Sequence, residues 1–449
     1  MKNTHAILLL ILTVFSISVQ SQSQSQFNFI GVNEKQVSFR FQLINNLIVI
    51  PLTVNNKALS FILDTGVNKT ILFNLTENDS IGLNNVKKTT LKGLGNGKPI
   101  EALLSKGNSM RIKNFNSKRE EIYVILEDRF DISSRMGTTV HGIIGYKIFK
   151  DAVVHINYFT KRITLYNPKY YKYKKCRKCE TFQLQFYRNK PYLNAKVQLD
   201  TIGEKLTDVK LLIDTGGTSA LWLFEGTKEV IKTPKRFFKD ILGEGLSGTI
   251  YGNKSRIKSV SLGRFLIKNP TVSFLDSTST FNARQFKERN GSIGGNILKR
   301  FKVWIDYANK TIILKKQSSF KGGFEYNMSG IDVVYNGKTL VKEKESIQAF
   351  NVNEDNNGSK NNTISFISSY KFRFKPSYKI KSVTPNSPAY EAGLMAGDVI
   401  LSINNVKVHQ LTLSQLLIKF QSGNLKKIRM RVDRKGKSLK FQFRLVKKI

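Results

Sequence analysis

Two identical tripeptides contain the residues of this chain that are best suited to chemistry. Each is an Asp-Thr-Gly at the end of an apolar run, with the aspartates at Asp64 and Asp214. Two carboxyl groups held together share a proton, so that one activates a water molecule while the other polarises a carbonyl group. A single Asp-Thr-Gly would fit an ordinary turn after a strand. The pair is informative because the flanking sequence repeats with it.

The repeat keeps a nearly constant spacing. Asp64 and Asp214 lie 150 positions apart, and a Gly-x-Ile-Gly pattern ends at Gly145 and again 149 positions later at Gly294. Four more pairs keep the 149-residue spacing: Tyr158, Lys161, Ile163 and Leu165 with Tyr307, Lys310, Ile312 and Leu314. Solenoid repeats have periods of roughly 20–50 residues. The longer spacing therefore predicts two copies of a domain-sized unit.

The two copies have the composition of β-sheet proteins. Segments such as 47–54 and 153–158 are rich in β-branched residues and are separated by polar turns. Short helices are predicted at 148–150 and 297–301, each after a Gly-x-Ile-Gly pattern. We therefore expect a mainly β unit with one small helix in each copy.

The remainder of the chain, residues 318–449, has a different pattern. Its polar stretch 337–376 predicts a flexible loop or insertion. A helix is predicted to begin at Ser387-Pro388 and to stop at Gly393, and Thr412 begins a capping box with a second helix behind it. Strands are predicted to end the chain.

The first 21 residues predict a secretory signal peptide. Lys2 provides a basic start, and 6–19 is an almost unbroken apolar run that is too short to cross a bilayer. We place cleavage after Ser21 and expect an exported protein that is periplasmic or extracellular. Because no cysteine lies at that point, a lipid anchor is not indicated.

The formal net charge of +41 leaves two interpretations open. Such a charge would attract the chain to an anionic envelope surface. It also fits a well-solvated surface from a Lys-rich proteome, and the scattering of the basic residues favours this second interpretation. No nucleic-acid-binding motif is present, so no nucleic-acid partner is expected.

The chain has two cysteines, Cys176 and Cys179, in a Cys-x-x-Cys spacing between the two repeats. A disulfide that clamps the inter-repeat linker is the favoured interpretation in an exported protein. Redox and metal-binding roles are the alternatives, although no second Cys or His pair accompanies the motif. We expect no metal ion and no organic cofactor.

The two Asp-Thr-Gly motifs and the two Gly-x-Ile-Gly patterns resemble those of retropepsin-like aspartic proteases, and this resemblance covers 27–317. The part of the chain that follows, about 318–449, resembles a PDZ domain. The second resemblance depends on a Ser-Pro-Ala, Ala-Gly-Leu, Gly-Asp-Val-Ile and Ile-Asn series between Ser387 and Asn404. The arrangement is similar to that of exported proteins of Bacteroidetes-type bacteria. The resemblance implies a bilobal, pseudo-twofold β-barrel fold, mainly β, followed by an α+β PDZ domain. The predicted segments are 1–21 (signal), 22–168 (first lobe), 169–181 (Cys-x-x-Cys linker), 182–317 (second lobe) and 318–449 (PDZ domain with the 337–376 insertion).

The resemblance also implies roles for single residues. Asp64 and Asp214 would form the catalytic pair, with one aspartate from each lobe. The residues that follow them, Thr65, Gly66, Thr215 and Gly216, would support the pair, the threonines by locking the two turns together. Glycine-rich stretches about 29 residues after each aspartate would be flaps, with Gly93, Gly95 and Gly97 in the first and Gly243 and Gly245 in the second. Ordinary glycine-rich turns are the alternative.

Some positions depart from the family pattern. Where pepsin-like enzymes carry a hydroxyl three residues after each aspartate, this chain has Val67 and Gly217. Loss of a donor to a carboxylate raises its pKa, so we expect activity at milder pH than for a gastric-type enzyme. The peptide-carboxylate loop of the PDZ domain would be Met328, Ser329, Gly330 and Ile331, which follow the usual loop pattern poorly.

The predicted function is that of an exported aspartic endopeptidase, whose PDZ module binds a substrate or another peptide, in a monomeric chain. A non-catalytic peptide-binding envelope scaffold is the main alternative, and a basic adhesin or structural protein is another. The presence of both aspartates favours the enzyme, since a decayed enzyme commonly loses one of them.

Overall fold

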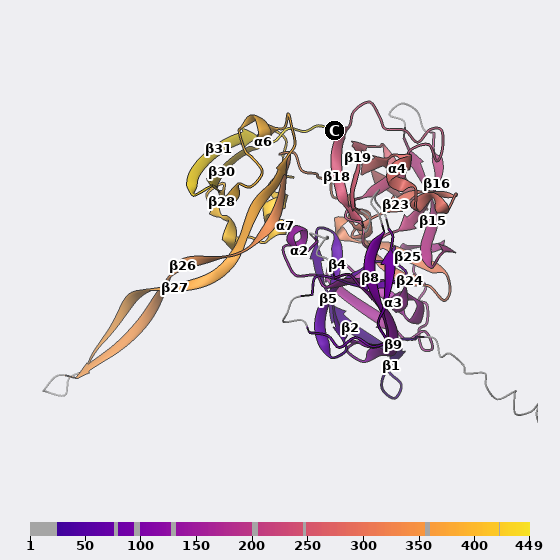
Figure 1. The fold of residues 1–449 in the computed structure, drawn as a ribbon, viewed down its shortest axis with the longest axis horizontal. Coiled ribbons are helices and arrows are strands. Elements are labelled where there is room, and N and C mark those ends of the chain that lie inside the picture. Colours follow the sequence, from indigo (N-terminus) through magenta and orange to yellow (C-terminus); the bar gives the residue numbers. More distant parts are fainter. Residues whose placement is uncertain are drawn as a thin grey trace, which may run out of the picture.

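The computed structural model describes residues 25–75, 80–93, 99–126, 132–199, 205–245, 248–354, 360–421 and 423–449, with backbone alone for Glu244, 346–354 and 360–367. Two β-rich lobes lie side by side, and a smaller C-terminal domain extends a long two-stranded ribbon away from them (Figure 1). The predicted signal peptide, 1–21, lies outside the described residues.

The first lobe is built on a nine-stranded sheet in the order β1-β9-β6-β10-β5-β4-β8-β7, with β3 paired to β4. Its strands are β1 (Asn28–Phe29), β3 (Gln42–Ile44), β4 (Leu47–Val54), β5 (Lys57–Leu63), β6 (Thr70–Leu72), β7 (Lys87–Leu91), β8 (Ile100–Ile112), β9 (Phe115–Val124) and β10 (Gly142–Ile144). Its helices are α2 (Ile132–Met136) and α3 (Tyr146–Asp151). The predicted helix at 148–150 is therefore present, and it begins two residues earlier.

The second lobe repeats this plan with a ten-stranded sheet in the order β18-β19-β22-β17-β23-β16-β15-β20-β21, with β14 paired to β15. The strands are β14 (Gln185–Tyr187), β15 (Lys190–Gln198), β16 (Thr207–Ile213), β17 (Leu221–Phe224), β18 (Phe238–Gly245), β19 (Gly248–Arg256), β20 (Ser259–Leu262), β21 (Phe265–Lys268), β22 (Thr271–Leu275) and β23 (Arg289–Ile293). The helical segments are α4 (Ser277–Thr280), η2 (Ala283–Gln285) and α5 (Gly295–Leu298). The helix predicted at 297–301 is wrong at both ends, because Gly295 begins it and Phe301 already belongs to a strand.

A third sheet joins the lobes. Its order is β13-β25-β24-β11-β12-β2, from β2 (Gln36–Arg40), β11 (Val153–Asn157), β12 (Arg162–Tyr166), β13 (Cys179–Gln183), β24 (Phe301–Asp306) and β25 (Thr311–Lys316). β11 of the first lobe pairs with β24 of the second, and one apolar core runs through both lobes.

Cys176 and Cys179 form a disulfide. The linker is shorter than the predicted 169–181, because β13 begins at Cys179 and pairs with β25.

The C-terminal domain has its own core and a six-stranded sheet in the order β26-β27-β28-β30-β31, with β29 paired to β28. A short helical turn, η3 (Ser318–Lys321), precedes it. Its elements are β26 (Ile331–Glu354), β27 (Lys360–Val383), α6 (Pro388–Glu391), β28 (Val399–Ile403), β29 (Val406–Lys407), η4 (Val408–Gln410), α7 (Leu413–Ile418), β30 (Lys427–Arg434) and β31 (Lys437–Arg444). Two predicted helix starts are confirmed: Ser387 caps α6, and Thr412 forms a capping box with Gln415 at α7.

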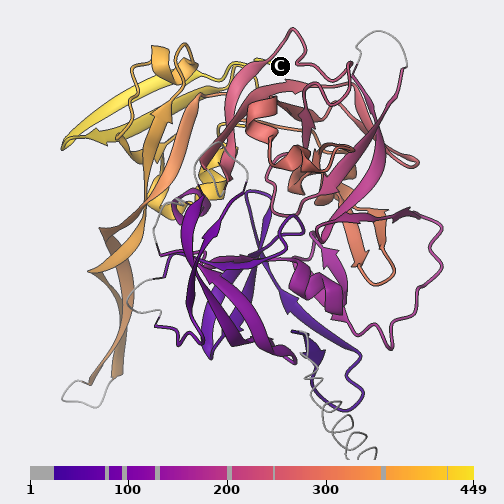
Figure 2. The same cartoon turned by 45° about the vertical axis from the view of Figure 1, so that its right-hand side comes forward.

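Of the flexible loop or insertion predicted at 337–376, the flexible loop is wrong. Most of this stretch belongs to β26 and β27, which pair with each other and project as the ribbon seen in Figures 1 and 2. Exposed apolar side chains alternate along one face of the ribbon, at Leu340, Tyr370, Phe372 and Phe374. Period-two alternation is the pattern of a strand. The polar composition of the stretch as a whole obscured this pattern in the sequence.

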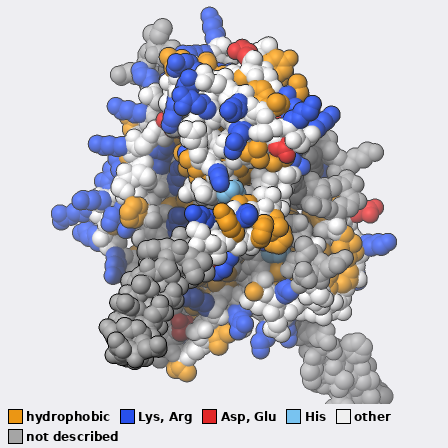
Figure 3. Space-filling model, turned by 90° about the vertical axis from the view of Figure 1, so that its left-hand side faces the viewer, with side chains coloured by type: hydrophobic (Ala, Val, Ile, Leu, Met, Phe, Trp, Pro, Cys, Tyr) orange, Lys and Arg blue, Asp and Glu red, His pale blue; other side chains and the backbone are white. Residues whose placement is uncertain are grey.

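Basic side chains are spread widely over the surface. Figure 3 shows Lys and Arg distributed over the visible face, with few acidic side chains among them. This agrees with a chain of 73 basic and 32 acidic residues. None of the helices in the described residues is both long enough and apolar enough to cross a lipid bilayer.

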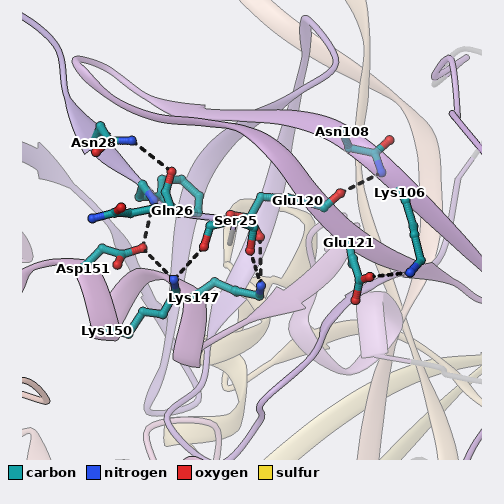
Figure 4. Close-up of polar contacts among 11 residues, drawn as sticks. Ser25, Gln26, Asn28, Lys106, Asn108, Glu120, Glu121, Lys147, Lys150 and Asp151 are labelled. Carbon is teal, nitrogen blue, oxygen red and sulfur yellow. Dashed lines mark hydrogen bonds and ion pairs between the residues drawn. The ribbon is translucent and has the colours of Figure 1, made fainter. Parts of the chain in front are cut away.

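Polar contacts hold α3 against the first lobe (Figure 4). The Phe27 N–H donates to the Asp151 carboxylate at 2.8 Å, and Lys150 Nζ donates to the Ser25 carbonyl at 2.6 Å. Lys147 lies 3.4 Å from the buried Glu120 carboxylate of β9. A buried carboxylate needs such a countercharge. These contacts fix α3, which directly follows Gly145.

Candidate active site

Each aspartate follows the same local arrangement of strands. Asp64 comes directly after β5 and its N–H donates to Ile144 O at 2.9 Å, while Asp214 comes directly after β16 and its N–H donates to Ile293 O at 3.0 Å. In each lobe the strand before the aspartate runs parallel to the strand of the Gly-x-Ile-Gly pattern. The pattern thus crosses behind the aspartate in both lobes, and it fixes the backbone there.

Two threonines join the turns beneath the aspartates. Thr65 N–H donates to Thr215 Oγ1 at 3.0 Å, and Thr215 N–H donates to Thr65 Oγ1, also at 3.0 Å. Each hydroxyl in turn donates to the opposite lobe, Thr65 to Ile213 O at 2.6 Å and Thr215 to Leu63 O at 2.7 Å. Both side chains are buried. The predicted threonine lock is therefore present in the geometry, and it ties the two lobes at the base of the carboxyl pair.

The two carboxyl groups interact directly. A hydrogen bond links Asp64 and Asp214, and Gly66 N–H donates to Asp64 Oδ1 at 2.6 Å. Desolvation by the surrounding protein, together with the negative charge of Asp214, raises the pKa of Asp64 to about 7. Desolvation also raises the pKa of Asp214, while Arg289 and Lys190 oppose that rise. The pair therefore holds a shared proton up to near-neutral pH, which is the state that acid–base activation of water needs.

The carboxyl pair lies in a cavity of about 1470 Å³ between the lobes. Its first-lobe side includes Leu47, Ile62 and Ile143, and its second-lobe side includes Lys190 and Leu212. Two hairpins border the cavity. Leu91 lines it from the β7/β8 hairpin, and Ile241 and Tyr251 line it from the β18/β19 hairpin. A cavity of this size between two lobes can hold an extended peptide segment.

Three of the predicted flap glycines, Gly93, Gly243 and Gly245, lie in or next to the strands of these hairpins. Gly243 and Gly245 belong to β18, where a register shift next to Gly243 interrupts the ladder. Gly93 follows β7, and its carbonyl accepts a hydrogen bond from Asn282 of the second lobe at 2.9 Å. Gly95 and Gly97 lie outside the described residues.

Comparison with known families agrees with this geometry. A family model described as "Aspartyl protease" matches residues 50–148, and one described as "PDZ domain" matches residues 379–434. This chain contains an aspartyl protease domain and a PDZ domain. The resemblance to an aspartyl protease and a PDZ domain is thereby confirmed.

Among solved structures, the chain is similar to the crystal structure of aspartic proteinase from Irpex lacteus. The TM-score is 0.43 at 11% identity, with 64% of this chain and 99% of that chain covered. No curated protein matches the chain.

The PDZ domain lies next to the protease cavity. Arg135 of α2 forms an ion pair with Asp332 of β26 at 3.2 Å, and the same cavity that contains the aspartates is lined by Ile331 and Val333 of β26 and by Leu417 and Ile418 of α7. The groove between these two elements is where a PDZ domain adds a peptide strand. In this structure the groove therefore opens toward the carboxyl pair.

The predicted carboxylate loop has an internal set of bonds. Met328 N–H donates to Phe420 O, Ser329 N–H donates to Asn327 Oδ1, and Ile331 N–H donates to Ser329 Oγ. Gly330 has a φ of 82°, and a Cβ there would lie 2.2 Å from Ser387. Binding of a peptide carboxylate at this loop would have to replace those bonds, so its role stays a prediction.

Lys190 and Arg289 are residues near the aspartates that motif analysis did not single out. Both line the cavity, and both act on the charge of Asp214. Neither belongs to a motif, and each stands at the place of an apolar residue in the first repeat. Comparison of the two repeats position by position could have found them. Among the described residues, no group of His, Cys, Asp or Glu side chains is arranged to hold a metal ion.

Proposed function

We propose that the chain is an exported aspartic endopeptidase in which Asp64 and Asp214 activate a water molecule against a peptide bond. The observation that carries the proposal is the hydrogen-bonded carboxyl pair, with its raised pKa values, at the floor of a cavity between two lobes. The deprotonated carboxylate takes a proton from water, while the protonated carboxyl donates to the carbonyl oxygen of the substrate. The threonine lock keeps the two carboxyl groups in register.

The test is cleavage of a mixed peptide library by the chain from Gln22 onward, between pH 3 and 8. Cleavage that a statine-type inhibitor blocks would support the peptidase. Absence of cleavage at every pH would contradict it, and would favour the peptide-binding scaffold that retains this fold. The export part of the proposal is supported by the composition of 1–21. It predicts that the protein recovered from outside the cytoplasm begins at Gln22, which N-terminal sequencing measures.

The pH dependence follows from the pKa of Asp64. That value, about 7, is the pH at which the pair loses its shared proton. We therefore expect kcat/KM to stay high in mildly acidic solution and to fall above pH about 7, which a pH–rate profile on a cleaved library peptide measures. An optimum confined to strong acid would contradict this expectation.

The position of the PDZ groove supports a role in holding substrate near the aspartates. Ile418 of α7 is 57% exposed and lines the shared cavity. Ile418→Asp should raise KM for long peptide substrates about tenfold, because burial of an apolar side chain is worth about 1.5–3 kcal/mol. The kcat, and the KM for peptides too short to reach the groove, should not change. Equal effects on short and long peptides would contradict this role.

The proposal includes contact of the ribbon with an anionic lipid surface. Its exposed face combines Phe372 and Phe374 with Lys342, whose Nζ lies 4.1 Å from the Tyr370 ring centroid. Aromatic and basic side chains on one face suit an anionic interface. The pair of changes Phe372→Ser and Phe374→Ser should reduce sedimentation with phosphatidylglycerol vesicles, whereas Val341→Ser on the opposite face should not. Equal binding to neutral phosphatidylcholine vesicles would contradict it.

A further inference from the structure

The two lobes are equivalent around the aspartates, which allows a comparison position by position. In the first lobe, Ile62 pairs with Val49 on one side and Ile143 on the other. In the second lobe, Leu212 pairs with Tyr192 and Ser292 in the same arrangement. Leu47 begins β4 two residues before Val49, and Lys190 begins β15 two residues before Tyr192. Lys190 therefore occupies the place of Leu47.

Arg289 has an apolar counterpart as well. It lies two residues before Gly291, and Val140 lies two residues before Gly142, at the matching place just before the Gly-x-Ile-Gly strand of the first lobe. Val140 is fully buried and packs in the apolar cluster that also contains Leu47. The second lobe thus replaces an apolar pair by two cations in the wall of the same cavity.

The guanidinium group of Arg289 is bound by neutral groups. Its Nε donates to Gly291 O at 3.2 Å, and one terminal nitrogen donates to Ser292 Oγ at 2.7 Å. The guanidinium lies 5.0 Å from the Phe224 ring centroid and is almost completely buried. Tyr192 also hydrogen-bonds to it. A buried cation is costly unless a nearby anion compensates it.

The aspartates compensate only part of this positive charge. With one shared proton, the pair carries a single negative charge, which faces the two cations Lys190 and Arg289. The two cations also repel each other: burial and Arg289 together lower the pKa of Lys190. Among the described residues, Asp64 and Asp214 are the carboxyl groups that act on these two cations. One positive charge beside the aspartates is therefore left over there, and a ligand carboxylate would balance it.

We infer that Lys190 and Arg289 form a carboxylate-binding subsite on the second-lobe side of the catalytic pair. The substrate is then a peptide with an acidic group next to the scissile bond on that side and an apolar residue on the other side, against Leu47 and Ile143. The acidic group is the side chain of Asp or Glu, or the carboxyl terminus of the peptide. This inference rests on the proposed function and adds the substrate class to it.

The test compares peptides that differ only in charge. For the chain from Gln22 onward, a peptide with Glu next to the scissile bond should be cleaved with kcat/KM at least about tenfold above its Gln counterpart, because a charge-assisted hydrogen bond is gained. A second pair, which ends in a free carboxylate or in an amide one residue after the scissile bond, distinguishes the terminal source from the side-chain source. Equal rates within both pairs would overturn the inference.

Variants of Lys190 test whether the preference for Glu over Gln comes from the proposed subsite. Lys190→Leu, which installs the residue of the first lobe, should bring the Glu/Gln ratio to within about twofold, and Lys190→Arg should keep the preference. Lys190→Glu should favour a Lys-containing peptide. Lys196→Leu is the matched control, since Lys196 is on the same strand and pairs with Asp208 away from the cavity. A Glu preference that survives Lys190→Leu would overturn the inference.

Binding measurements separate this inference from the proposed function. Fluorescence anisotropy of the same labelled peptides needs no chemistry and can be measured with Asp64→Asn. Tighter binding of the Glu peptide, together with no cleavage by the wild type, would refute the peptidase and support the subsite. Cleavage without charge preference would support the peptidase and refute the subsite.

Discussion

Asp64→Asn and Asp214→Asn are each expected to reduce kcat/KM by about 10²–10⁴-fold, the usual contribution of acid–base groups. Asn keeps the shape of the side chain but can neither take a proton from water nor give one to a carbonyl oxygen. The two variants should be affected similarly, because the shared proton belongs to the pair. Kinetic assays with the peptide cleaved best by the wild type measure this.

The stability of Asp64→Asn separates lost chemistry from lost folding. The pKa of Asp64 is about 7 in the folded chain against an ordinary 3.8, so the folded state binds the proton more tightly. Stability of the wild type should therefore fall as pH rises between these two values. The Asn side chain does not titrate, so Asp64→Asn removes this dependence of stability on pH. Thermal unfolding of Asp64→Asn at pH 8 should be at or above the wild-type midpoint, and a large decrease would mean that the lost activity reports misfolding.

Gly216→Ala is expected to reduce activity by about 100-fold, since displacing a catalytic group by about 1 Å can have an effect of that size. A Cβ at this position would lie 2.2 Å from Asp64 Cγ, so the carboxyl group would have to move. Overpacking of this kind also destabilises a protein by about 1–3 kcal/mol. Kinetic assays and urea unfolding measure the two effects.

Two other glycines provide matched controls. At Gly66 the added Cβ would lie 3.0 Å from Asp64 Oδ1 and 3.3 Å from Asp214 Oδ1, so Gly66→Ala should have a milder effect. At Gly82 a Cβ would meet no atom within 4 Å, and Gly82→Ala should change neither activity nor stability. Normal activity in Gly216→Ala would mean that the position of the Asp64 carboxyl group does not limit the reaction.

Local sequence signals located the carboxyl pair and the threonine hydrogen bonds beneath it. Asp64, Asp214 and the threonines follow strands in motifs whose geometry depends on neighbouring residues, and the repeat revealed the second copy. The capping box at Thr412 was predictable for the same reason, because its two hydrogen bonds join residues three positions apart. Local motifs of this kind determine local backbone geometry.

Features that depend on spatial neighbours were not predictable in this way. The ribbon was missed because 337–376 is polar, although Tyr370, Phe372 and Phe374 alternate in it. Lys190 and Arg289 lie 99 positions apart and come together only through the pairing of β15, β16 and β23. The opening of the PDZ groove into the protease cavity depends on contacts such as Arg135 with Asp332, which no sequence motif contains.

The central claim is that Asp64 and Asp214 of one chain form a single site complementary to the transition state of peptide hydrolysis. Calorimetric titration with a statine-type peptide, whose hydroxyl mimics the attacked carbonyl, tests this most directly. The account predicts one inhibitor bound per chain, and loss of binding in both Asp64→Asn and Asp214→Asn. One inhibitor per two chains, or binding that is unchanged in both variants, would contradict it.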